Sequence, residues 1–194
     1  GRAMIRILST ARTEFRIALR NRWVAIALVL MAVFSLVLSL AGSAPTGGLG
    51  VDRLSVTVAS LTSLSVYLIP LLALLMSFDA IAGETERGTL PLLLAYPIAR
   101  WEILVGKLLA HLTILTLAVL LGHGLAAGVT FWSDPEAVNG LPSLWRLSWS
   151  SVLLGATFLG AGYALSALSR RPSGAAGLAI GLWLGLVVLY DLAL

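Results

Sequence analysis

Long runs of apolar residues separated by short polar segments dominate this chain. The first run covers residues 23–42 without a charge, and as a helix it would extend about 30 Å, the thickness of a bilayer's hydrocarbon core. A Gly-, Pro- and Ser-rich turn follows at residues 42–50. Four further runs of spanning length cover about residues 59–82, 103–132, 147–168 and 173–194. The pattern therefore predicts an all-α polytopic bundle with five transmembrane helices.

Composition agrees with this pattern. The 194 residues are 59% hydrophobic and 11% charged, against about 25% charged residues in soluble domains. These values exclude an ordinary soluble domain and a disordered chain. Cysteine is absent, which excludes disulfides and thiolate metal sites, and two histidines are too few for a polyhistidine metal centre. The net charge of +4 reflects scarce acids, and we expect no nucleic-acid partner.

The basic residues are distributed unevenly between the two sides of the predicted bundle. If the N-terminus is cytoplasmic, only Arg53 and Arg146 lie outside, and eleven of the 13 Lys and Arg residues lie inside: Arg2, Arg6, Arg12, Arg16, Arg20, Arg22, Arg87, Arg100, Lys107, Arg170 and Arg171. Lys and Arg in short loops resist translocation. We therefore expect a multi-pass inner-membrane protein whose N-terminus is cytoplasmic.

Residues 1–22 form a predicted amphipathic helix ahead of the first span. On a helical wheel one side carries Arg2, Arg6, Arg12, Arg16 and Arg20, and the opposite side carries Met4, Ile7, Leu8, Ala11, Phe15, Ala18 and Leu19. Such a helix lies in the membrane interface, with its basic face among anionic headgroups. Two roles remain open: a topology anchor, or an elbow helix that cradles a cytoplasmic partner.

The segment 83–102, between the second and third spans, concentrates charge, glycine and proline. Gly88 can turn the backbone, Thr89 can cap a helix and Pro97 can stop it, which predicts a short helix over about residues 90–96. One interpretation is a hairpin loop with solvated charges. The other is a docking helix, because its apolar side chains need lipid or a partner's groove to bury them: Leu90, Leu92, Leu93, Leu94 and Tyr96.

This segment resembles the membrane subunits of type-2 ABC exporters. Their second and third spans are joined by the pattern D-x-x-x-x-E-x-x-x-G-T-L-x-x-L-L-x-x-P-[IL]-x-R-x-x-[IL]-x-x-G-K. Here it is matched by Asp79, Glu84, Gly88, Thr89, Leu90, Leu93, Leu94, Pro97, Ile98, Arg100, Ile103, Gly106 and Lys107. Within the family, residues 11–23, 58–84 and 175–194 are most similar to permeases that serve the maturation of nitrous oxide reductase.

The resemblance implies a permease subunit that forms a homodimer and binds two cytoplasmic ATPase subunits, which would carry the ATP and Mg²⁺. The chain itself lacks the phosphate-binding G-x-x-x-x-G-K-[ST] motif and would not be an enzyme. The short helix would be the coupling helix. The implied contact with the ATPase comprises Glu84, Glu86, Arg87, Gly88, Thr89, Leu93, Pro97 and Arg100.

For the maturation subgroup, the resemblance further implies a periplasmic accessory protein and a role in assembling the copper-sulfide cluster of nitrous oxide reductase. Two alternatives remain: a generic drug or lipid exporter of the same family, and a membrane scaffold that does not transport. The family has six spans, whereas this sequence supports five and ends at Leu194 in apolar sequence. We expect a truncated chain, with a five-span protein as the alternative.

Polar and small residues within the spans are further candidates. Asp79 is either a functional intramembrane acid or an interfacial acid paired with Arg87. His111 and His123 are expected to form hydrogen bonds between helices, with a proton or cargo path through His123 as the alternative. Close helix packing is expected along two glycine series, at Gly155, Gly160 and Gly162 and at Gly174, Gly177, Gly181 and Gly185.

Overall fold

The computed structural model describes residues 1–41 and 53–194, with side chains in the second range described from residue 56. The described residues form eight α-helices and one 3₁₀ helix, and contain no strand. The expected turn at residues 42–50, the last residue of the first predicted span and the side chain of Arg53 lie outside the described part. The expectation of an all-α chain is confirmed.

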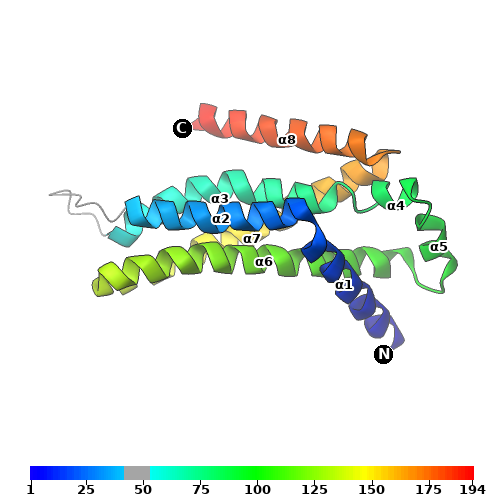
Figure 1. The fold of residues 1–194 in the computed structure, drawn as a ribbon, viewed down its shortest axis with the longest axis horizontal. Coiled ribbons are helices and arrows are strands. Elements are labelled where there is room, and N and C mark those ends of the chain that lie inside the picture. Colours follow the sequence, from blue (N-terminus) through cyan, green and yellow to red (C-terminus); the bar gives the residue numbers. More distant parts are fainter. Residues whose placement is uncertain (42–52) are drawn as a thin grey trace.

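Five helices in the described part are long and apolar enough to cross a membrane. Figure 1 shows four of them side by side, and the fifth, α8, set apart along one side of the bundle. The five are α2 (Arg22–Ala41), α3 (Arg53–Ser77), α6 (Arg100–Ser133), α7 (Leu141–Leu168) and α8 (Pro172–Ala193). They correspond in order to the five predicted spans.

The core lies where α2, α3, α6 and α7 meet, and its largest fully buried side chains include Met31, Ile69, Ile114, Leu115 and Leu159. Glycine on α7 lets this helix approach α3 closely, since a Cβ at Gly162 would lie 1.7 Å from Ser77 Oγ. The expected close packing is thus met at Gly155 and Gly162. It is not met at Gly160 or along α8, where no described atom comes within 4 Å of a Cβ built on Gly174, Gly177, Gly181 or Gly185.

Helix α1 (Arg2–Arg20) projects from the bundle at an angle and packs across the first turns of α6 (Figure 1). The helices approach closely at Gly106, where a Cβ would lie 2.7 Å from the side chain of Thr10. Ile7 and Ala18 are buried, whereas Met4 and Leu8 remain exposed. The apolar face is therefore divided between contacts with the protein and an exposed surface, which is available to lipid.

Two element boundaries differ from the prediction. Helix α3 ends at Ser77 and is followed by turns, so the predicted second span to residue 82 is too long at this end. Helix α7 begins at Leu141, directly after the 3₁₀ helix η1 (Pro135–Gly140), whereas the predicted fourth span begins at about residue 147. Pro142 lies in the first turn of α7, where the missing N–H costs no hydrogen bond.

Two short helices, α4 (Ala82–Glu86) and α5 (Leu90–Ala95), connect α3 to α6 at one end of the bundle. The predicted short helix over residues 90–96 matches α5 to within one residue. Helix α4 was not predicted as a separate element. Together they place the charged segment of the sequence beside the junction of α1 and α6, where the candidate site lies (Figure 1).

Candidate functional site

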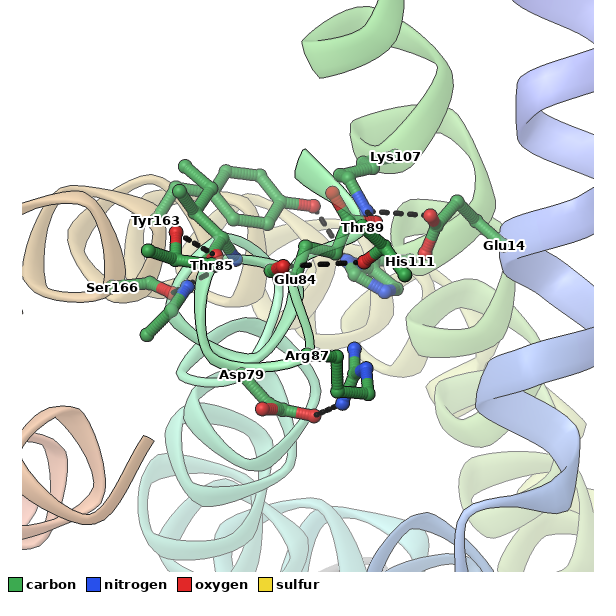
Figure 2. A network of polar contacts seen from close by, with 12 residues as sticks. Glu14, Asp79, Glu84, Thr85, Arg87, Thr89, Lys107, His111, Tyr163 and Ser166 are labelled. Carbon is green, nitrogen blue, oxygen red and sulfur yellow. Dashed lines mark hydrogen bonds and ion pairs between the residues drawn. The ribbon is translucent and has the colours of Figure 1, made fainter. Parts of the chain in front are cut away.

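The beginning of α4 is fixed to α7 by one buried hydroxyl group. Ser166 Oγ accepts hydrogen bonds from the backbone N–H groups of Ile81, at 3.0 Å, and Ala82, at 2.9 Å (Figure 2). The first N–H groups of a helix have no partner within the helix. Ser166 satisfies two such donors and ties a five-residue helix to a long one.

The middle of α4 is fixed by a buried lysine shared between two carboxylates. Lys107 Nζ on α6 donates to Glu14 Oε1 on α1 at 2.5 Å and to Glu84 Oε1 on α4 at 2.8 Å (Figure 2). The lysine side chain is 4% exposed and each glutamate side chain 12%. A buried charge needs a partner to offset its desolvation. This Glu14–Lys107–Glu84 cluster therefore holds α1, α4 and α6 in one arrangement.

The end of α4 turns sharply into α5. Gly88 has φ +69°, and the N–H groups of Gly88 and Thr89 donate to the carbonyls of Thr85 and Glu84, a Schellman arrangement. The Thr89 hydroxyl also donates to the Glu84 carbonyl, at 3.2 Å. Thr89 is the N-cap residue of α5, at the expected position, but its side chain makes no cap hydrogen bond to α5 and instead bonds to the preceding helix.

A second ion pair joins the residues on either side of α4. Arg87 Nη1 lies 3.6 Å from Asp79 Oδ2, and both side chains are partly exposed (Figure 2). Of the two interpretations left open for Asp79, the geometry matches the acid paired with Arg87. An exposed pair of this kind contributes little to stability. It does link Asp79, which precedes α4, to Arg87, which follows it.

Helix α5 is exposed, unlike α4, which has three buried residues. None of its six residues is buried, and exposed fractions reach 64% at Leu92, 40% at Leu94 and 64% at the adjoining Tyr96. Leu92 and Tyr96 are four residues apart and lie near one face, whereas Leu94 lies about 200° around the helix from Leu92, so apolar side chains are exposed on more than one side of α5. We call Leu92, Leu94 and Tyr96 the α5 surface. Helix α5 follows α4, which is bound to α7 and to the Glu14–Lys107–Glu84 cluster.

The residues predicted for an ATPase contact fall into two groups. Glu86, Arg87, Gly88, Pro97 and Arg100 are exposed, and Thr89 and Leu93 are partly exposed. Glu84 differs, because it is 9% exposed and bound to Lys107. The Glu84 side chain is therefore engaged within the protein, and its contact with an ATPase stays a prediction.

Sequence reasoning missed the groups that hold α4: Glu14, Lys107 and Ser166. Lys107 closes the matched motif as its final G-K, which was the available signal, but neither the motif nor the charge count assigned it a partner. Glu14 and Ser166 carried no signal. A fourth missed group is Glu102, which is buried, accepts from the Ala99 N–H at 2.9 Å, and lies 3.5 Å from Arg6 of α1.

Both histidines form hydrogen bonds between helices, as expected. His111 Nδ1 lies 2.6 Å from the Tyr163 hydroxyl on α7. His123 is bonded on both ring nitrogens, through Nε2 to Ser65 on α3 at 2.9 Å and through Nδ1 to Ser148 on α7 at 2.8 Å. These bonds join α6 to α3 and α7.

Among the described residues, no group of three or more His, Cys, Asp or Glu side chains could hold a metal ion. A cavity of about 70 Å³ with polar and apolar lining residues lies beside the Glu14–Lys107–Glu84 cluster. Glu84 Oε2 is buried and has no hydrogen-bond partner in the described chain.

Comparison with known proteins agrees with this fold. Residues 8–194 match the model of the ABC-2 family transporter protein. A curated relative from Pseudomonas aeruginosa, named probable ABC transporter permease protein NosY, is 46% identical over 190 residues, covering 97% of this chain and 69% of the relative. A relative of the same name from Stutzerimonas stutzeri is 42% identical over 203 residues, covering 98% and 70% respectively. The chain therefore belongs to the ABC-2 family of transporter proteins, as a multi-pass membrane subunit.

Proposed function

We propose that this chain is the permease subunit of an ATP-driven transporter and that α5 docks on a separate cytoplasmic ATPase. The observation that carries the proposal is the pairing of an exposed apolar helix, α5, with an anchored one, α4. A rigid connector transmits a rotation of its partner, whereas a flexible loop would absorb it. Membership of the ABC-2 family supports a partner that supplies ATP hydrolysis.

The orientation required by this proposal has independent support. Helices α1, α4 and α5 lie toward one end of the bundle, together with the α7–α8 turn (Figure 1). That end carries eleven of the 13 basic residues counted above. By the positive-inside rule it faces the cytoplasm of an inner-membrane protein, where an ATPase would have access to the α5 surface.

Movement of the ATPase would reach the spans by a defined route. The α5 surface would sit in the ATPase groove, with Glu86, Arg87 and Arg100 at its polar rim. Displacement of α5 would then pull on α4, which is bound to α7 through Ser166 and to α6 and α1 through Lys107. The permease would form a homodimer, and the ATP and Mg²⁺ would reside on two ATPase subunits.

The work proposed for this transporter is a step in building the copper-sulfide cluster of nitrous oxide reductase, with a periplasmic protein as the outer partner. The relatives named NosY support this assignment at 46% and 42% identity. The resemblance of residues 11–23, 58–84 and 175–194 to maturation permeases supports it as well. A sulfur species, or mechanical work on the outer partner, would be the output.

The test is affinity purification of the tagged full-length protein from its native membrane in mild detergent, followed by mass spectrometry. We expect a P-loop ATPase and a periplasmic protein to be recovered. The variant Leu92→Glu, which places a charge in the α5 surface, should lose the ATPase and keep the periplasmic protein. Leu141→Glu, at the opposite end of the bundle, is the control and should keep the ATPase.

The same experiment separates the alternatives. Recovery of an ATPase without any protein of nitrous oxide reductase maturation would favour a generic exporter. Recovery of neither partner at good yield would favour a scaffold and overturn the proposal.

A further inference from the structure

An apolar cavity of about 250 Å³ lies between α2, α3 and α8, and the proposed coupling does not use it. Its lining is almost entirely hydrocarbon: Trp23, Leu71, Leu74, Leu75, Phe78, Ala176, Ala179 and Ile180. Trp23 and Ile180 are 60% and 53% exposed, so the cavity opens to the outside of the described bundle.

The cavity exists because α8 is loosely attached. Only Ala175 and Ala179 of α8 are buried, and Figure 1 shows this helix apart from the other four spans. Deeper along the same two helices, Trp183 Nε1 donates to the Tyr67 carbonyl at 2.8 Å, and the Tyr67 hydroxyl donates to Asp191. These hydrogen bonds hold α8 against α3 about one turn beyond the cavity, and the cavity itself stays open.

Basic residues lie close in sequence to the lining of the cavity. Arg22 directly precedes Trp23, and Arg170 and Arg171 precede α8, with Ala176 about 7–8 Å further along the helix axis. All three arginines are exposed, and none has a carboxylate within 4 Å in the described part of the chain. Asp79, the acid next to Phe78, is already paired with Arg87.

We propose that this cavity binds an anionic phospholipid, with an acyl chain between α2, α3 and α8 and the phosphate at Arg22, Arg170 and Arg171. Apolar walls offer water no hydrogen bonds, so an acyl chain is the filler that a bilayer supplies. Basic groups between transmembrane helices recognise anionic headgroups. Arg22 and Arg171, close in sequence to the lining residues Trp23 and Ala176, favour an anionic headgroup over a neutral one.

Native mass spectrometry of the purified full chain tests the proposal, with dioleoyl phosphatidylglycerol and dioleoyl phosphatidylcholine as probes that share the same chains. We expect more and tighter phosphatidylglycerol adducts. The double variant Arg170→Gln/Arg171→Gln should weaken phosphatidylglycerol binding by about fivefold for each charge removed. Arg146→Gln, which removes an exposed charge at the opposite end, is the matched control and should leave binding unchanged.

A second variant tests the cavity itself. Ala176→Trp fills the space with an indole and should remove adducts of both lipids, while Gly124→Trp, which adds the same group on the lipid-facing surface of α6, should retain them. Equal binding of the two lipids to the unmodified protein, or unchanged phosphatidylglycerol binding in the arginine double variant, would overturn the proposal. Purification of a dimer without bound lipid would also overturn the proposal, because a second copy would then cover the cavity.

Discussion

Lys107 Nζ lies 2.8 Å from Glu84 Oε1 and joins residues that are separated by the whole of α5. The same ammonium group binds Glu14, so one buried cation connects α1, α4 and α6. This relationship explains how a five-residue helix can serve as a stiff support for α5. Substitution of Lys107 can therefore test how α4 is anchored.

Lys107→Met should destabilise the protein strongly. Removing the cation leaves two carboxylates buried without their partner, which costs about 3–5 kcal/mol in comparable buried pairs. Thermal unfolding in detergent should show a clear fall in Tm. Adding Glu14→Gln and Glu84→Gln to Lys107→Met removes the uncompensated charges and should recover a large part of the loss. An unchanged Tm in Lys107→Met would show that the cluster does not hold α4.

Gly106→Ala should weaken the contact between α1 and α6. The added Cβ would lie 2.7 Å from the Thr10 side chain and 3.1 Å from the Ile7 carbonyl oxygen, so α1 must shift. Overpacking of this kind costs about 1–3 kcal/mol. The matched control is Gly124→Ala on the same helix, where no described atom lies within 4 Å of the new Cβ. We expect lower thermal stability for the first variant and no loss for the second.

Glu86→Arg should reduce association with the proposed ATPase and leave membrane insertion intact. Glu86 is exposed at the end of α4 and has no ion-pair partner among the described residues, so reversing its charge changes the rim of the docking site without disturbing the fold. Co-purification measures the effect. Glu136→Arg, in η1 at the opposite end, is the control. Full ATPase retention by Glu86→Arg would remove this residue from the contact.

His111→Phe should destabilise the contact between α6 and α7. Tyr163 is 7% exposed, and its hydroxyl would be left buried without its histidine partner, at a cost of about 1–3 kcal/mol. The double variant His111→Phe/Tyr163→Phe removes both polar groups and should be more stable than His111→Phe alone. Equal stability of the two variants would mean that the hydroxyl finds another partner.

The spans and α5 were predictable because their signals are local. An uncharged run such as residues 23–42 must be long enough to cross the hydrocarbon core, and Gly88 and Pro97 delimit a short helix between them. Helix α7 was predicted to begin too late because Pro142 looks like part of a loop in sequence, although proline also fits the first turn of a helix.

The anchoring of α4 was not predictable in this way. Glu14 and Lys107 lie 93 residues apart, and nothing in the spacing of charges along one sequence indicates that α1 crosses α6 at Gly106. Ser166 resembles the other serines of α7 until the fold places it beneath the first N–H groups of α4. The partners of these side chains depend on tertiary packing, which the hydropathy of the sequence does not predict.

The docking of α5 on an ATPase can be tested directly because the sequence contains no cysteine. Leu94→Cys on α5 and Leu141→Cys at the opposite end are matched probes, with exposed fractions of 40% and 42% in the unmodified residues. Each variant is treated with a short thiol crosslinker in native membranes. We predict a covalent adduct with a P-loop ATPase for Leu94→Cys and none for Leu141→Cys. The same ATPase present in the membrane but absent from the Leu94→Cys adducts would contradict the proposed coupling.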